Sequence, residues 1–212
     1  MDERSSLIET FEGIVEKAAP GMAPSYTQAH VLMALETIQS FESIGRLKLS
    51  RILKIGEGAM RTMIRRLLQK GLVKVSREGV SLSSEGERFM SELRRIVTPQ
   101  LKIPSSGLTV GEYNVAIMVK DSSSAVRRGL EQRDAAIRVG ASGATTLIFK
   151  MGKLIIPGME EDEVYFNQTY RLLMKKMKPD EGDVIIIGSA ENEHLASLGA
   201  KMAVMELLKS VK

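Results

Sequence analysis

Residues 44–87, IGRLKLSRILKIGEGAMRTMIRRLLQKGLVKVSREGVSLSSEGE, decide how the first half of this chain folds. Apolar residues recur there at three- and four-residue steps, which predicts a helix over 48–54 and a second over 57–70. The turn between them, Ile55-Gly56-Glu57-Gly58, holds two glycines, which we expect to adopt the positive φ of a sharp helix-to-helix turn. Gly71 fits the position that follows a helix C-terminus.

Two short strands and a further helix are predicted next. Residues 72–75 and 80–82 alternate as strands do, and the turn between them contains Arg77. The sequence Ser84-Glu85-Gly86-Glu87 has the pattern of a capping box, which predicts that a helix begins there. The order helix-turn-helix, hairpin, helix is that of a winged helix.

The charge of the chain is concentrated in the same stretch. Residues 44–77 contain ten basic residues and a single acidic one, Glu57. The net charge of the whole chain is only +4, because residues 1–40 carry an excess of acidic groups and residues 110–212 carry 14 basic and 14 acidic groups. A basic helix-turn-helix requires an anionic partner, and double-stranded DNA fits its shape.

Two helices are predicted before the winged helix. Apolar residues at helical spacing indicate an amphipathic helix over 7–18, which residues 19–24 end. Ser25 and Gln28 then have the spacing of a capping box, so we expect a second helix from Ser25 to about Gln39.

The composition excludes several classes of protein. The chain has no cysteine, which rules out disulfides, thiolate metal sites and cysteine nucleophiles. No apolar run approaches the length of about 18 residues that a membrane span needs, and the acidic N-terminus has no signal-peptide profile. We therefore expect a cytoplasmic protein that does not associate with membranes.

Residues 99–109 form a polar linker containing Pro99 and Pro104, which divides the chain into a DNA-binding domain over 1–98 and a second domain over 110–212. In the second domain we predict strands over 113–119, 145–150, 153–156 and 183–187. Helices are predicted over 123–139, 164–177 and 194–208; residues 135–139 fit either a helix end or a strand. This β-α-β-β-α-β-α order predicts a two-layer α/β sandwich of ferredoxin-like type, so the whole chain is of the α+β class.

The residues from Leu49 to Phe89 resemble winged-helix transcription regulators, many of which continue from the wing with a strand, Ser/Thr-Glu-Gly and a helix. The whole chain, including GASGATTLIFKMGKLIIPG at 140–158, is similar to a family of archaeal winged-helix proteins with an uncharacterised C-terminal domain. The members of that family are regarded as regulators, so the resemblance implies transcription regulation. It implies little about the C-terminal half.

The predicted second helix of the helix-turn-helix has two sides. Met60, Ile64, Leu67 and Leu68 form its predicted buried side, and the opposite side is expected to face the DNA major groove with Thr62, Arg65, Arg66 and Gln69. We expect phosphate contacts from Lys48, Ser50, Arg51 and Arg61, and a contact of Arg77 with the minor groove. Single-stranded nucleic acid is disfavoured, because no aromatic residue lies between Phe41 and Phe89 to stack on bases.

Two segments of the C-terminal half are candidates for an anionic ligand. Ser122 and Ser123 on one, and Gly188 and Ser189 on the other, are each expected in a loop that follows a strand and opens a helix, where free backbone N–H groups can hold a phosphate or carboxylate. Capping of the helices by serine is the alternative explanation. The two histidines, His30 and His194, lie in different predicted domains, and no residue spacing indicates a metal site, a cofactor or a catalytic constellation.

The resulting prediction is a sequence-specific, double-stranded DNA-binding regulator whose C-terminal domain senses a small anionic effector, forms a homodimer, or both. Dimerisation is expected because one winged helix alone offers a short readout. One alternative is an enzyme that acts on a phosphorylated small molecule and carries an appended winged helix. The other is a nucleic-acid-binding module without sequence preference.

Overall fold

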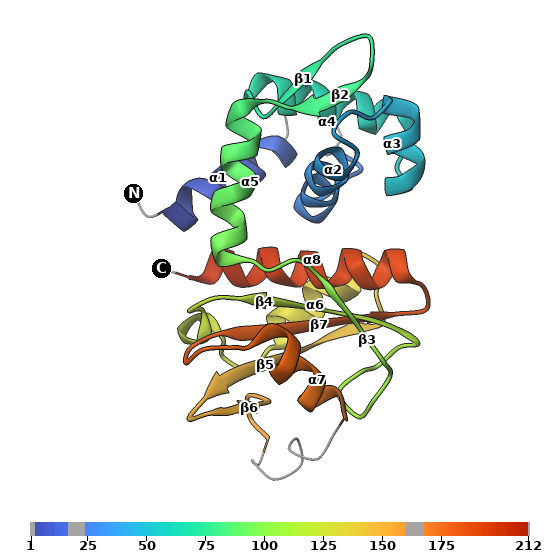
Figure 1. Ribbon diagram of the computed structural model, residues 1–212. Helices are drawn as coiled ribbons and strands as arrows, with labels where there is room; N and C mark the ends of the chain where they lie inside the picture. Colours follow the sequence, from blue (N-terminus) through green and yellow to red (C-terminus); the bar gives the residue numbers. More distant parts are fainter. Residues whose placement is uncertain (1–2, 17–23, 160–167, 212) are drawn as a thin grey trace. The chain divides into compact units, whose positions relative to one another are not determined.

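The computed structural model describes residues 3–16, 24–159 and 168–211. The chain divides into two compact units, Met1–Leu93 and Arg94–Lys212 (Figure 1). It is an α+β protein, with a mainly helical first unit and a sheet-based second unit. No helix in the described ranges has the length and hydropathy that crossing a bilayer requires.

The N-terminal unit has the predicted order of elements. These are α1 (Glu3–Val15), α2 (Gln28–Phe41), α3 (Arg46–Leu53), α4 (Glu57–Gln69), β1 (Val73–Val75), β2 (Val80–Leu82) and α5 (Ser84–Ile96), whose last residues belong to the second unit. Leu7, Phe11 and Ile14 of α1 are buried, and the rings of Phe11 and Phe89 lie 5.4 Å apart at 59°. The apolar stripe of α1 is thus part of the core of this unit.

Helix α2 begins later than the sequence predicts. The expected capping box of Ser25 and Gln28 is wrong, because Gln28 is already the first helical residue and is buried. Thr27 is the N-cap, and its backbone N–H donates to His30 Nδ1 at 3.1 Å. His30 therefore fills the place that a Glu or Gln takes in the usual capping box.

The turn between α3 and α4 uses a different residue from the expected one. Lys54 adopts the left-handed conformation (φ 52°), and its N–H bonds to the last carbonyls of α3. Gly56 is the extended N-cap of α4 (φ −62°, ψ 150°), and Gly58 lies within α4, so the prediction that the two glycines take up positive φ is wrong. The left-handed residue is the one that closes α3, whereas the residue that opens α4 has to be extended. Gly71, at φ 73°, follows α4 as predicted.

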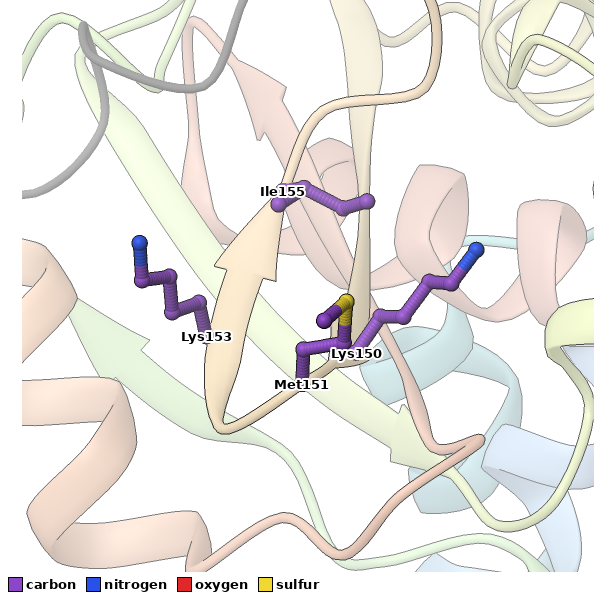
Figure 2. A pocket seen from close by; sticks show the side chains of 4 residues that line it. All are labelled: Lys150, Met151, Lys153 and Ile155. Carbon is purple, nitrogen blue, oxygen red and sulfur yellow. The ribbon is translucent and has the colours of Figure 1, made fainter.

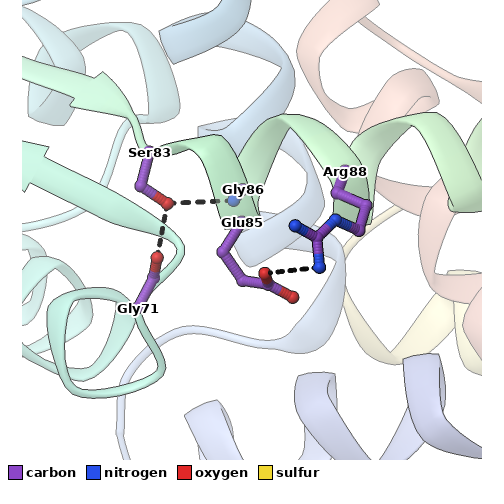
Figure 3. A network of polar contacts seen from close by, with 5 residues as sticks. All are labelled: Gly71, Ser83, Glu85, Gly86 and Arg88. Atoms are coloured by element: carbon purple, nitrogen blue, oxygen red, sulfur yellow. Dashed lines mark hydrogen bonds and ion pairs between the residues drawn. The ribbon is translucent and has the colours of Figure 1, made fainter.

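The wing contains one pairing that the sequence does not predict and one shifted cap. Ile44 forms an isolated bridge with Val80, beside the β1–β2 hairpin. The N-cap of α5 is Ser83 and not Ser84: Gly86 N–H donates to Ser83 Oγ at 3.0 Å, and the same hydroxyl donates to Gly71 O (Figure 3). A Cβ at Gly86 would lie 2.0 Å from Leu72 O, so only glycine allows α5 to lie this close to the start of the hairpin.

The C-terminal unit is an antiparallel sheet with helices on both faces. Its elements are β3 (Leu101–Ile103), β4 (Tyr113–Val119), the 3-10 helix η1 (Ser123–Ala125), α6 (Leu130–Arg138), β5 (Gly143–Lys150), β6 (Lys153–Ile155), α7 (Gln168–Met177), β7 (Val184–Ala190) and α8 (Glu193–Ser210). The predicted strand at 113–119 and the hairpin around Met151-Gly152 are confirmed. Part of the predicted helix at 164–177 lies outside the described residues.

The five strands lie in the order β3-β4-β7-β5-β6, and β7 pairs with both β4 and β5. Ile187 packs in a cluster with Leu173 of α7, whereas Gly188, its neighbour in the strand, faces Ala200 of α8. Because consecutive strand residues face opposite sides of a sheet, α7 covers one face and α8 covers the other, together with α6 (Figure 1).

The predicted two-layer sandwich of ferredoxin-like type is therefore wrong, because helices cover both faces of the sheet and the strand order differs. That fold places the third strand of the β-α-β-β-α-β unit beside the first, but here the last strand, β7, separates β4 from β5 and leaves β6 at an edge. The predicted linker over 99–109 contains β3, which pairs with β4. The predicted helix over 123–139 consists of η1 and α6, and residues 135–138 are helical, not strand.

Candidate nucleic-acid interface

Helix α4 has one buried and one open side. Met60, Met63, Ile64 and Leu67 are buried, while Arg61, Arg65 and Gln69 are exposed. Leu68, which the sequence assigns to the buried side, is 42% exposed, and Met63 takes its place in the core. Arg61, Arg65 and Gln69 form no side-chain hydrogen bond or ion pair within the described part of the chain, so their donors remain available to a partner. Thr62 is half-buried, and its hydroxyl donates to Gly58 O at 3.1 Å.

Two more of the predicted DNA-contacting residues have partners inside the unit. Arg66 is half-buried, and its Nη1 donates to Ile14 O at the end of α1, 2.7 Å away. Ser50 is buried, and its hydroxyl donates to Ile55 O at 2.7 Å, which holds the α3–α4 turn. Arg66 therefore lies at the flank of α4 and not on its open side, and Ser50 has no access to a phosphate.

The open side of α3 and the wing carry further cations. Lys48 and Arg51 are exposed on α3, and the ammonium group of Lys48 lies 4.1 Å from the centre of the Phe41 ring. Lys54 is exposed at the helix-to-helix turn, and Arg77 is exposed at the tip of the wing. The prediction omitted Lys54, although it belongs to the same basic run. Its position in the turn between the two helices could have identified it as a candidate for DNA contact.

A groove beside the wing has the opposite character. It is lined by residues at the end of α2, in the hairpin and in α5: Gln39, Glu42, Ser43, Lys74, Ser76, Glu78, Ser81, Leu82 and Glu87. Three carboxylates and one ammonium group make it unsuitable for a phosphate backbone. The groove thus marks a boundary of the basic surface.

In the first candidate anion loop of the C-terminal unit, the backbone N–H groups of the expected residues are already bonded. The backbone N–H groups of Ser122 and Ser123 both donate to Gly182 O at 2.9 Å. The Asp183 carboxylate, which is buried, accepts from the N–H groups of Asp121 and Asp180, each at 2.9 Å. These bonds join the turn after β4 to the turn before β7, which is a structural role.

The second candidate loop is not a loop. Gly188 and Ser189 lie inside β7 and are buried. A Cβ at Gly188 would lie 2.5 Å from the backbone nitrogen of Ala200, so this glycine is needed for the close packing of α8 on the sheet. Ser189 Oγ accepts from Val110 N–H at 3.3 Å. The sequence misplaced the end of this strand, and the predicted ligand site loses its geometric basis.

A small pocket lies at the tip of the β5–β6 hairpin. It is lined by Lys150, Met151, Lys153 and Ile155, and the two lysines, which are register partners, point in different directions (Figure 2). Strand β6 is at the edge of the sheet among the described strands, and lysines at an edge oppose pairing with another sheet. Among the described residues, no group of three or more His, Asp or Glu side chains could hold a metal ion.

Comparison with known proteins divides the chain in a similar way. Residues 30–97 match the family model described as "CggR N-terminal DNA binding domain", and residues 110–207 match "Domain of unknown function (DUF4443)". No curated protein matches the chain.

Among solved structures, the hypothetical protein PH0730 from Pyrococcus horikoshii OT3 is 26% identical, with a TM-score of 0.67; the alignment covers 88% of this chain and 100% of that one. The activation domain of the phage T4 transcription factor MotA is 17% identical (TM-score 0.32), with 44% of this chain and 87% of that chain covered. The reduced form of MarR from E. coli is 21% identical (TM-score 0.31), with 44% and 65% covered.

Proposed function

We propose that this chain, which joins a CggR-like N-terminal DNA-binding domain to a DUF4443 C-terminal domain, is a transcription regulator that binds specific sequences of double-stranded DNA. The observation that carries the proposal is the open side of α4. Arg61, Arg65 and Gln69 present donors without partners among the described residues, on a helix whose other side is fixed in the core. Such a helix can enter the major groove, where guanidinium and amide groups distinguish base pairs.

In the proposed complex, Arg65 and Gln69 contact base edges, and Thr62 lies beside them. Lys48, Arg51 and Arg61 contact backbone phosphates, and Arg77 extends from the wing toward the minor groove. Ser50 and Arg66 are left out of this interface, because Ser50 is buried and Arg66 is bonded to the end of α1.

Homodimerisation is part of the proposal. A single winged helix reads few base pairs, and two copies related by a two-fold axis read two half-sites with a fixed spacing. We assign dimerisation to the C-terminal unit, whose neutral charge over residues 110–212 gives it no reason to contact DNA. The matched families include a DNA-binding domain and a domain of unknown function, so they lend no support to the enzyme alternative.

The test is selection of the full-length protein on a pool of random duplexes, followed by sequencing of the bound fraction. We expect one enriched motif, and a motif with two symmetric half-sites would support the dimer. Affinity that is the same for all duplexes would favour the module without sequence preference. No binding to any duplex at low salt would contradict the proposed function.

A further inference from the structure

Helix α4 is attached to α1 through two cations on its flank. Arg66 and Lys70 lie four residues apart and therefore share one side of α4. Arg66 Nη1 donates to Ile14 O, and a Cβ at Gly13 would lie 3.0 Å from Lys70 Nζ. Both cations thus reach the last turn of α1.

The last turn of α1 is a favourable place for cations. The final carbonyls of a helix have no partner within the helix, and the helix dipole places partial negative charge there. Helix α1 has no basic residue of its own in that turn. The Tyr26 hydroxyl, which is buried, donates to the same Ile14 oxygen at 3.1 Å. One carbonyl of α1 therefore accepts from α4 and from the segment that leads into α2.

We propose that Arg66 and Lys70 are positioning residues, which fasten α4 to the C-terminal end of α1 and so set the direction in which Arg61, Arg65 and Gln69 point. Helix α1 lies before residues 30–97, the part that matches the CggR-like domain, so this attachment is an addition to the matched region. The consequence for DNA rests on the proposed function, whereas the attachment itself does not.

The attachment follows from the geometry of α4. Met60, Met63, Ile64 and Leu67 fix one side of the helix in the core, but apolar burial is non-directional. A charge-assisted hydrogen bond from the flank to a neighbouring helix end has a defined direction. Base readout depends on that direction, because each donor on α4 has to meet one base edge.

The experiment compares Arg66→Gln with Arg65→Gln in the full chain. The two variants remove the same charge from adjacent positions of one helix, and Arg65 has no hydrogen-bond partner among the described residues. Amide hydrogen exchange is measured in the last turn of α1. We expect Arg66→Gln to speed exchange there roughly tenfold, as the loss of a hydrogen bond to a charged group implies, and Arg65→Gln to leave it unchanged. Tyr26→Phe, which removes the second donor to Ile14 O, should speed exchange less than Arg66→Gln does.

The same variants are then taken through duplex selection well below their melting temperatures. Loss of orientation should weaken preference at several base positions in Arg66→Gln, while Arg65→Gln should relax a single position. Arg66→Lys keeps a cationic donor and should recover part of the preference. These variants also distinguish positioning from a purely structural role, because a residue that contributes only stability would leave the selected motif unchanged.

The outcomes are separable. If hydrogen exchange in α1 is the same in Arg66→Gln as in the unmodified protein, Arg66 does not fasten α4 to α1. If Arg66→Gln relaxes one base position and leaves α1 exchange unchanged, Arg66 is a DNA contact and the inference is overturned. If the unmodified protein selects no duplex, the proposed function fails, and the exchange measurement still decides whether Arg66 fastens α1.

Discussion

The open side of α4 and the serine-bearing segments of the C-terminal unit both contain polar residues, but they differ in whether the hydrogen-bond donors are already bonded within the protein. The side chains of Arg61, Arg65 and Gln69 have no hydrogen-bond partner within the described residues. By contrast, the N–H groups of Ser122 and Ser123 are bonded to Gly182 O, and Ser189 is buried in a strand. A polar segment therefore indicates a binding site only when its donors are not already used by the fold.

The largest effect is expected on the stability of the C-terminal unit, where two backbone N–H groups donate to the carboxylate of Asp183. Asp183→Ala removes a buried carboxylate and leaves the N–H groups of Asp121 and Asp180 without their acceptor. The free energy of unfolding should fall by about 2–3 kcal/mol, measured by urea denaturation of the full chain. The matched control is Asp134→Ala, an exposed carboxylate paired with Arg133, whose effect should stay within about 0.5 kcal/mol. Equal effects of the two variants would show that the Asp183 bonds do not organise this unit.

The next largest effect is expected on DNA affinity, when a side-chain donor on the open side of α4 is removed. If Arg65 reads a base edge, Arg65→Ala should weaken binding to the selected duplex by about 1–3 kcal/mol and relax preference at one base position. Binding is measured by fluorescence anisotropy on the selected duplex and on a scrambled one. Equal losses on both would mean that Arg65 contacts only a phosphate.

A smaller effect is expected from removing the proposed phosphate contacts. Arg51→Ala and Arg77→Ala should weaken binding to all duplexes alike, and each should flatten the log–log dependence of affinity on salt by about 0.9. Arg88→Ala is the matched control, since Arg88 is an exposed arginine of α5 that pairs with Glu85 at 3.1 Å (Figure 3). A slope that is unchanged in the Arg51 and Arg77 variants would remove both residues from the interface.

The smallest effect is a pH dependence of the stability that Tyr26 contributes where it bonds to the end of α1. Burial raises the pKa of Tyr26, and the nearby Arg66 guanidinium opposes that shift. A phenol whose pKa is raised by folding contributes stability that is present below its unfolded pKa of about 10 and is lost as the pH rises toward the folded value. The stability of the unmodified protein relative to Tyr26→Phe should therefore decrease above about pH 10. A constant difference in alkaline urea titrations would contradict this account of Tyr26.

Local patterns predicted the N-terminal unit well. The helical spacing of Met60, Ile64 and Leu67 and the glycine at Gly71 located α4 almost to the residue. The sequence did not distinguish Arg66 from Arg65, because the position of α1 beside one flank of α4 is a tertiary fact. Likewise, Ser50 is polar in sequence but buried in the turn.

In the C-terminal unit, local sequence patterns predicted individual strands but not the order of the strands in the sheet. Strand β4 and the hairpin at Met151-Gly152 were predicted from the sequence. Strand order depends on pairings between distant segments, and β7 inserts between β4 and β5 without a local signal. Gly188 and Ser189 read as a loop because glycine and serine are frequent in turns, whereas here glycine is required by the approach of α8.

The central claim is that the unoccupied donors of α4 read a DNA sequence. The most direct test is the ratio of affinities of the full-length protein for its selected duplex and for a scrambled duplex of the same length and composition, at physiological salt. The account predicts a preference of about 10³ or more for the selected duplex. A ratio close to one, with measurable binding to both duplexes, would contradict it.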